Sequence, residues 1–270
     1  MLHFPNCKIN LGLYIKEKRA DGFHNLESVL YPLPLRDALE IIESDSLSFE
    51  SNGIAIPGDA AGNIVIKAYK LLKTDFPQLP FVSIVLLKKI PAGAGLGGGS
   101  ADGTEMLKLL NEKFQLNIGD EKLSQYALQL GSDCPFFIKN IPALATGRGE
   151  ILNPVHLDLS NYHFVIVKPD IHISTAWAFS QITPKAESQD LPEIIKQPIE
   201  TWRGVLKNDF EQPIFEKYPE IRIIKEKLYE AGAVYSSMSG SGSAVYGIFK
   251  EKSQIRLLKS QIPNAEVFVC

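Results

Sequence analysis

The feature that most constrains this chain is a run of five glycines within seven residues, between positions 93 and 99. The apolar segment 81–87 before it predicts a buried strand, and Pro91 ends that strand because proline cannot donate to the ladder. After the run, Met106 and several leucines at helical spacing predict a helix over about residues 100–114. The glycines therefore form a strand-to-helix turn.

A turn of this kind is well suited to binding an anion. Glycines let backbone N–H groups turn inward without Cβ clashes, and Ser100 is expected to cap the helix that follows. The positive end of that helix then faces the same hollow, which favours phosphate. Because no lysine follows the last glycine, the stretch is not a Walker loop.

Two alternatives stay open for the glycine run. One is a turn that binds nothing, although each glycine costs about 0.5 to 1 kcal/mol of ordering entropy relative to alanine. The other is a dinucleotide site, because residues 93–98 spell G-x-G-x-x-G, and it makes an oxidoreductase a rival function. That fingerprint normally follows the first strand of a βαβ unit, and an acidic residue at the end of the next strand follows it about twenty residues later. Neither condition is met here.

The composition narrows the class of partner. With 270 residues, 45% of them hydrophobic, the chain is expected to form one large or two modest domains. A formal net charge of −3 gives no basic field for nucleic acid or an anionic membrane, so a small-molecule partner is favoured. Because no signal-peptide pattern or membrane-spanning run is found, a cytoplasmic protein is expected.

The cysteines give no sign of a disulfide framework or a zinc site. Cys7, Cys134 and Cys270 form an odd, sparse set without C-x-x-C spacing. They are expected to be small buried thiols.

The N-terminal part predicts a hairpin that carries polar residues. Residues 9–15 alternate as a half-buried strand, an Asp-Gly turn follows, and residues 25–33 form a second strand. Lys8 and Asn10 share one face of the first strand, and His24 follows the turn. Either these residues belong to a site, or they form an exposed strand face with a satisfied histidine.

Two further segments have a structural and a functional interpretation. Asp133 follows a predicted helix over 121–130; it either caps a short helical turn near Pro135 or is a rigidly held carboxylate for phosphoryl transfer. A second Gly/Ser cluster, 238–244, precedes a strand over 245–249. This cluster is either a hairpin or bulge, or part of a site.

Three segments together resemble the motifs of the GHMP small-molecule kinases, and the resemblance covers nearly the whole chain. They are Lys8–Leu11, Pro91–Ala101 and Met238–Ser243. The resemblance implies an α+β fold of two domains, a ribosomal protein S5-like domain over residues 1–157 and a ferredoxin-like domain over 158–270. ATP and substrate are then expected in the cleft between them.

Within the family, three stretches are similar to members that act on a diphosphocytidyl derivative of methylerythritol. They are Arg19–His24, the triple glycine Gly97–Gly99 and Leu130–Pro135. The implied reaction transfers phosphate from ATP, with Mg²⁺, to the 2-hydroxyl of that substrate in the non-mevalonate route to isoprenoid precursors. Kinases of mevalonate, homoserine or galactose remain competitors within the family. An RNA-binding module with an S5-like domain remains a competitor outside it, although the net acidity disfavours it.

The resemblance also implies residue roles. Asp133 matches the catalytic carboxylate, and Lys8 matches the residue that holds it and stabilises the transferring charge. The implied substrate-binding residues are Asn10, Phe23, His24, Thr175, Phe179, Gly240 and Ser241. The implied ATP-binding residues are Asn63, Pro91, Ala92, Gly93, Ala94, Gly95, Leu96, Gly97, Gly98, Gly99, Ser100 and Ala101.

The chain departs from relatives at two of these places. Phe23 stands where relatives often have tyrosine, which keeps stacking on the cytosine and loses a hydroxyl. After Ser100, relatives commonly have a second serine and an asparagine, and this chain has Ala101 and Asp102. Ser100 or Asp102 is therefore a possible Mg²⁺ ligand, and the alternative places Asp102 in the first helical turn, where it favours the helix dipole. A monomer or weak homodimer is expected.

Overall fold

The computed structural model describes residues 1–59, 61–184, 190–255 and 258–270. The chain divides into two compact units. Unit 1 comprises Met1–Lys8, Pro34–Ala92 and Gly97–Ile141, and unit 2 comprises Ile9–Leu33, Gly93–Leu96 and Pro142–Cys270. Each unit contains strands and helices, which confirms the α+β prediction. Both units are discontinuous in sequence. The predicted domain limits, with a single division between residues 157 and 158, stay a prediction.

Unit 1 is built on a sheet of four strands in the order β1-β4-β6-β5. These strands are β1 (Leu2–His3), β4 (Ala38–Glu43), β5 (Ser48–Gly53) and β6 (Val82–Lys88). β4 is antiparallel to β1 and β6, whereas β5 runs parallel to β6. In β6, buried residues alternate with more exposed ones, which is the pattern of a sheet with one covered face.

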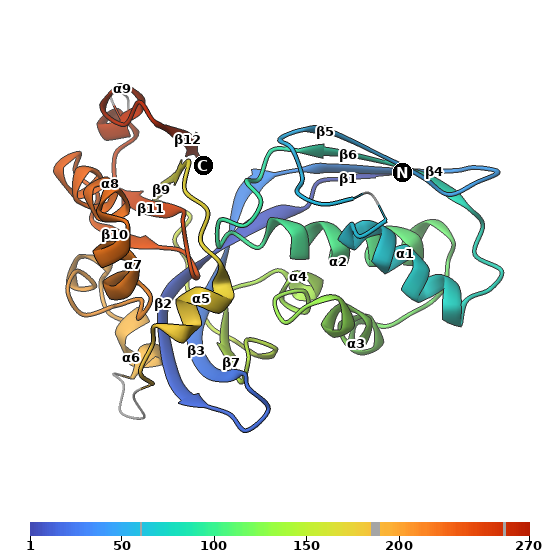
Figure 1. The fold of residues 1–270 in the computed structure, drawn as a ribbon, viewed down its shortest axis with the longest axis horizontal. Coiled ribbons are helices and arrows are strands. Elements are labelled where there is room, and N and C mark those ends of the chain that lie inside the picture. Colours follow the sequence, from blue (N-terminus) through green and yellow to red (C-terminus); the bar gives the residue numbers. More distant parts are fainter. Residues whose placement is uncertain (60, 185–189, 256–257) are drawn as a thin grey trace. The chain divides into compact units, whose positions relative to one another are not determined.

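Helices α1 (Ile64–Asp75) and α2 (Gly98–Lys113) cover that face of the sheet. Helix α3 (Asp120–Leu130) packs on α1 and α2, and the short α4 (Phe136–Lys139) packs on α2 and α3. Figure 1 shows α1 and α2 side by side along the sheet. Their apolar stripes and the inward residues of β4 and β6 form one buried core, so α2 is held firmly on the strand that precedes it.

The start of α2 corrects the expected cap. Gly97 occupies the N-cap position with φ 69°, in the left-handed region that glycine favours, and no side chain caps the helix. Because Gly97 itself turns the chain into the helix, α2 begins at Gly98. Ser100 is therefore the third helical residue and does not cap the helix. Asp102 consequently lies in the second turn and not the first.

The first sheet of unit 2 contains the predicted hairpin. Its strands, in the order β2-β3-β7-β8, are β2 (Asn6–Lys18), β3 (His24–Arg36), β7 (Ala143–Thr146) and β8 (Ile151–Pro154). The outer ends of β2 and β3 extend into unit 1. The expected half-buried pattern of β2 is wrong, because its residues are buried without interruption from 7 to 15.

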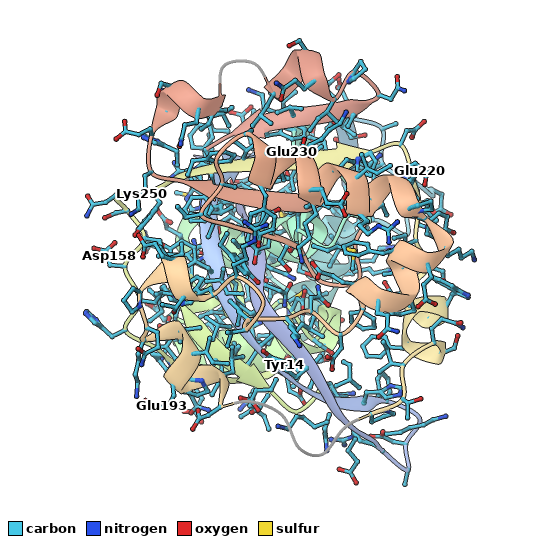
Figure 2. The ribbon with its side chains drawn as sticks, turned by 90° about the vertical axis from the view of Figure 1, so that its left-hand side faces the viewer. Tyr14, Asp158, Glu193, Glu220, Glu230 and Lys250 are labelled. Atoms are coloured by element: carbon cyan, nitrogen blue, oxygen red, sulfur yellow. The ribbon has the colours of Figure 1, made fainter. Side chains whose placement is uncertain are left out.

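The reason is a segment of the C-terminal part that packs along β2. Leu13 exchanges backbone hydrogen bonds of 2.9 Å with Lys207 and Asp209, like a short additional strand. Tyr14, labelled on β2 in Figure 2, accepts a hydrogen bond from the Lys207 N–H at 3.2 Å. This segment covers the edge of β2, and Leu191 and Leu206 pack against Gly12 of the strand, which alternation in the sequence did not reveal.

The second sheet of unit 2 is antiparallel, in the order β10-β11-β9-β12. Its strands are β9 (His163–Pro169), β10 (Tyr235–Met238), β11 (Val245–Phe249) and β12 (Ala265–Val269). Helix α8 (Pro219–Glu230) packs on β10 and β11, and its end residues Glu220 and Glu230 are labelled in Figure 2. The remaining helical segments are α5 (Thr175–Ser180), α6 (Leu191–Ile195), η1 (Ile199–Thr201), α7 (Glu211–Lys217), η2 (Lys252–Ile255) and α9 (Leu258–Gln261).

All three cysteines are thiols rather than disulfides. Cys7 and Cys134 are buried as predicted. The prediction is wrong for Cys270, which is half-buried because it follows the edge strand β12. Within the described parts of the chain, no helix has the length and apolarity that a membrane crossing needs.

Candidate active site

The candidate catalytic pair lies in unit 1. Lys8 Nζ is 3.4 Å from Asp133 Oδ2, and the two side chains are 4% and 40% exposed. Lys8 comes from the start of β2, and Asp133 from the turn between α3 and α4. The capping interpretation of Asp133 is wrong, because Pro135 holds the N-cap position of α4 and makes no side-chain cap bond. The half-exposed carboxylate is thus held by a buried lysine.

Gly97 packs directly on this pair. A Cβ added to Gly97 would lie 3.0 Å from Lys8 Cγ and 3.1 Å from Phe137 Cζ. Together with its positive φ, this close approach requires glycine at position 97. The absence of a side chain at Gly97 therefore makes room for the stem of Lys8. The space next to the Gly97 Cα is occupied by Lys8 and Phe137.

The first turn of α2 provides backbone donors next to the pair. The N–H groups of Gly98, Gly99 and Ser100 have no intrahelical carbonyl partner, as at every helix start. Gly99 is exposed, and a Cβ at this position would meet no atom within 4 Å. Open space is therefore found at Gly99, and the dipole of the 16-residue helix favours negative charge near this end.

Ser100 is connected to the turn that carries Asp133. Its hydroxyl hydrogen-bonds the thiol of Cys134, and burial, opposed in part by this bond, raises the pKa of Cys134 to about 11. One turn further along α2, the Thr104 hydroxyl donates to the Cys134 carbonyl at 2.9 Å. These bonds fix the 131–135 turn to the first turns of α2.

Asp102 fits neither of the two roles expected for it. Its side chain lies in the second turn of α2, is 2% exposed, and accepts a hydrogen bond from Lys88 Nζ at 2.7 Å. Lys88 also pairs with Asp37, so Asp102 belongs to a buried ionic cluster. In the described ranges, no group of three His, Cys, Asp or Glu side chains is arranged to hold a metal ion. Asp102 therefore does not fit a Mg²⁺ ligand.

Asn63 begins α1 as expected. Its Oδ1 accepts a hydrogen bond of 3.0 Å from the Val65 N–H, which makes it the N-cap. The adjacent Ile64 lies against α2, because a Cβ added to Gly103 would be 2.7 Å from Ile64 Cγ1. Gly103, which has no side chain, therefore allows the start of α1 to approach α2 closely.

In unit 2, the two glycine-rich segments of the sequence meet. Residues 238–244 form the turn of the β10–β11 hairpin, as the structural interpretation predicted. The Ser239 hydroxyl donates to the Gly95 carbonyl at 2.8 Å, and a Cβ on Gly95 would lie 2.0 Å from Ser239 O. Position 95 therefore admits only glycine, since the two backbones are in contact.

Asn10 lies beneath this meeting point. Its backbone N–H donates to Ser239 Oγ at 3.3 Å, and its Nδ2 donates to Ser28 Oγ at 2.8 Å. With Asn10 at 5% and Lys8 at 3% exposure, the exposed-face interpretation of the first strand is wrong. The side-chain oxygen Oδ1 of Asn10 faces Gly240, whose added Cβ would lie 3.5 Å away.

An aromatic group surrounds His24. The ring of His24 stacks on Phe179 with centroids 4.9 Å apart and 21° between the planes, and Phe179 meets Phe210 edge to face. Burial, followed by the charge of Lys18, lowers the pKa of His24. The imidazole is therefore neutral at pH 7 and offers one donor and one acceptor.

Phe23 and Thr175, two more of the predicted substrate-binding residues, make contacts of their own. Phe23 is 52% exposed, and the guanidinium carbon of Arg148 lies 4.9 Å from its ring centroid. Thr175 begins α5 one turn before Phe179, and its hydroxyl is 3.2 Å from Ser241 Oγ. Helix α5 thus connects the aromatic group to the second glycine-rich turn.

Several contributing residues were missed by the sequence analysis. Asn208 Nδ2 donates to the carbonyls of Met238 and Gly240, both at 2.8 Å, and so fixes the second glycine-rich turn. Neither Asn208 nor Arg148 stands in a motif, so no local signal indicated them. The sequence could have indicated Lys88, because it is a charged residue at the end of an apolar strand.

Comparison with known proteins decides the family. The model of the GHMP kinases N terminal domain matches residues 63–140, and the model of the GHMP kinases C terminal domain matches residues 191–267. A 4-diphosphocytidyl-2-C-methyl-D-erythritol kinase of Bacteroides fragilis is 55% identical over 259 residues, covering 94% of each chain. The chain belongs to the GHMP kinase family. A kinase of the same name from Parabacteroides distasonis is 48% identical, covering 95% of this chain and 94% of the relative.

Solved structures agree with this membership. The crystal structure of a 4-(cytidine 5′-diphospho)-2C-methyl-D-erythritol kinase is 28% identical, with a TM-score of 0.85 and coverage of 100% of this chain and 98% of that chain. A mevalonate kinase structure, 13% identical with a TM-score of 0.75, covers 100% and 98% and shares the fold alone. The predicted two-domain GHMP kinase fold is confirmed. As a GHMP kinase, the protein uses ATP.

Proposed function

We propose that this GHMP kinase is an alcohol-group phosphotransferase that moves the γ-phosphate of ATP to the 2-hydroxyl of 4-diphosphocytidyl-2-C-methyl-D-erythritol, in the non-mevalonate route to isoprenoid precursors. The relatives of this name from Bacteroides fragilis and Parabacteroides distasonis cover 94% and 95% of the chain at 55% and 48% identity. The observation in the structure that carries the chemistry is the Lys8–Asp133 pair beside the start of α2.

Asp133 is proposed to orient the substrate hydroxyl and to accept its proton. Its carboxylate is 40% exposed and so accessible to a ligand, while the buried Lys8 holds it on one side. Phosphoryl transfer needs positioning and charge stabilisation more than covalent chemistry. Lys8 is proposed to balance the negative charge that moves between the two substrates.

The glycine run is proposed to bind the triphosphate. The exposed Gly99 and the unpaired first N–H groups of α2 give close backbone approach and positive potential, as an anion requires. Asn63 at the start of α1 is assigned to the neighbourhood of the adenine. Since Asp102 is committed to Lys88, any Mg²⁺ would be carried by the nucleotide phosphates, and no step is assigned to it.

The unit 2 residues are proposed to recognise the other substrate. Neutral His24 has the donor and acceptor that the cytosine edge needs, and Phe23 and Phe179 give aromatic surfaces for stacking. The remaining assigned contacts are Asn10, Thr175, Gly240 and Ser241. A cytoplasmic location and a monomer or weak homodimer stay predictions.

Substrate profiling tests this function. Purified protein is incubated with ATP, Mg²⁺ and one alcohol at a time: the diphosphocytidyl substrate, mevalonate, homoserine or galactose. We expect ADP formation, and a phosphorus NMR signal of a new phosphomonoester, with the diphosphocytidyl substrate. Faster turnover of any other alcohol would refute the substrate assignment, and no turnover with all four would refute the proposed reaction.

A further inference from the structure

Three buried charged residues of unit 1 remain outside the catalytic pair. Asp37 lies between β3 and β4, Lys88 ends β6, and Asp102 lies in α2; their exposures are 1%, 2% and 2%. Lys88 Nζ donates to Asp37 Oδ2 and, at 2.7 Å, to Asp102 Oδ2. One lysine thus joins two carboxylates from different elements, and we refer to the three residues as the buried triad.

Asp37 extends the triad to the entry of the glycine run. Its Oδ1 accepts the backbone N–H groups of Lys89 at 2.5 Å and Ile90 at 2.7 Å. These are the last two residues before Pro91, where the chain leaves the sheet. One oxygen of Asp37 thus holds the strand exit, while the other holds Lys88.

Asp102 and Lys88 hold the opposite end of the run. Asp102 lies one turn after Gly98, the first residue of α2. A Cβ on Gly98 would be 3.0 Å from Lys88 Nζ and 2.6 Å from Ile90 Cγ2. The helix start therefore packs directly on the ammonium group and on the residue that Asp37 holds.

The triad holds two acidic side chains and one basic side chain. Both acids pair with Lys88, and among the described residues no group hydrogen-bonds the buried Asp102 Oδ1. Burial raises the pKa of Asp102 to about 8, although Lys88 opposes this. A buried ionic group contributes little to stability compared with apolar packing, but its hydrogen bonds fix a definite geometry.

We infer that the buried triad is a positioning device that sets the first turn of α2 against the exit of β6, and so holds the backbone donors at Gly98–Ser100 in place for the ATP phosphates. This inference rests on the proposed function for the identity of the anion. Asp37, Lys88 and Asp102 touch no reacting atom; they act through the backbone that they hold. Their removal is expected to weaken ATP binding more than it slows the chemical step.

The test compares three variants with the wild type. Asp102→Ala removes the link to Lys88, whereas Asp102→Asn keeps the shape and one acceptor for the lysine. Leu72→Ala is the matched control, because Leu72 is fully buried in the core on α1 and has no part in the triad. Urea unfolding first establishes that each variant is folded.

Two readouts follow on the folded proteins. For Asp102→Ala we expect the KM for ATP to rise about tenfold or more. Its kcat and its KM for the diphosphocytidyl substrate should change less than about threefold. The KM for ATP of Asp102→Asn should lie between those of Asp102→Ala and the wild type. Amide hydrogen exchange of the Ala101 N–H, which donates to Gly97 O at 2.9 Å in the wild-type structure, is expected to accelerate in the same order.

The outcomes separate the two proposals. Unchanged KM for ATP and unchanged exchange in Asp102→Ala would overturn the positioning role, and so would an equal rise of KM in Leu72→Ala. If Asp102→Ala does not fold, Asp102→Asn carries the test, and wild-type values for it would overturn the inference. A wild-type protein that transfers no phosphate from ATP would refute the proposed function, and amide exchange alone would then decide the role of the triad.

Discussion

Lys8 Nζ lies 3.4 Å from Asp133 Oδ2, although positions 8 and 133 are 125 apart in the sequence. The lysine is buried against Gly97 and Phe137, and the aspartate is partly open to solvent. A buried cation beside an accessible carboxylate holds that carboxylate in one orientation, which a hydroxyl-orienting group requires. The first two predictions test this pair.

Asp133→Asn should keep the fold and lose the reaction. Because Asp133 does not cap α4, the substitution removes no cap, and the loss of its partly exposed ion pair with Lys8 should lower the free energy of unfolding by at most about 1 kcal/mol. The kcat should fall by about 10²- to 10⁴-fold, because an amide cannot accept the hydroxyl proton. Steady-state kinetics and urea unfolding measure both quantities, with the exposed Asp45→Asn as control. A fully active Asp133→Asn enzyme would remove Asp133 from the mechanism.

Lys8→Met should also lower kcat, since it removes the charge that faces Asp133 and keeps the buried stem that packs on Gly97. In the Lys8→Met/Asp133→Asn double variant, the loss should be smaller than the product of the two single losses, because residues that act as a unit are not additive. A loss of kcat in the double variant equal to the product of the two single losses would show that the two residues do not cooperate.

The glycines of the run should separate into structural and ligand-binding positions. Gly99→Ala should stabilise α2 by about 0.5 to 1 kcal/mol, because Gly99 is helical and a Cβ meets open space. The same methyl group should weaken ATP binding measured by calorimetry, since it fills the proposed phosphate position. Gly97→Ala should instead destabilise the protein, because its φ is 69° and its Cβ would press on Lys8. Unchanged ATP affinity in Gly99→Ala would place the phosphates elsewhere.

His24→Ala should act on one substrate only. The residue stacks on Phe179 and is assigned to the cytosine, so the KM of the diphosphocytidyl substrate should rise at least about tenfold. The KM for ATP, measured on the same preparation, is the internal control and should stay within about twofold. A fall in kcat alone, or equal rises in both KM values, would contradict the assignment.

Asp102 should make stability depend on pH in an identifiable window. Burial raises its pKa from 3.8 to about 8 in the folded protein, so the folded state binds a proton that the unfolded state releases. The stability that this proton binding contributes is complete below pH 3.8 and is lost as the pH rises towards 8. Over that range the free energy of unfolding should fall by at most about 1.4 kcal/mol per pH unit. Urea unfolding between pH 5.5 and 9 should show this slope in the wild type and a shallower one in Asp102→Asn. Identical slopes would show that Asp102 is ionised throughout.

Much of the architecture was accessible from local patterns. Apolar runs predicted the strands at 81–87 and 245–249, and Asn63 was expected at the start of its helix, where the structure places it as the N-cap. Such features depend on the nearest few residues along the chain, and that is why the sequence reveals them. Local patterns failed at Ser100, because the left-handed Gly97 already turned the chain into α2.

By itself the sequence determined that a glycine turn joins a strand to a helix, and its motifs indicated the family to which the chain belongs. Only the tertiary structure decided what each polar side chain does. It placed Lys8 beside Asp133 and Gly95 against Ser239, and it buried Asp102 with Asp37 and Lys88. The physical reason is that the burial and partner of a charge depend on residues distant in sequence, which no local pattern specifies.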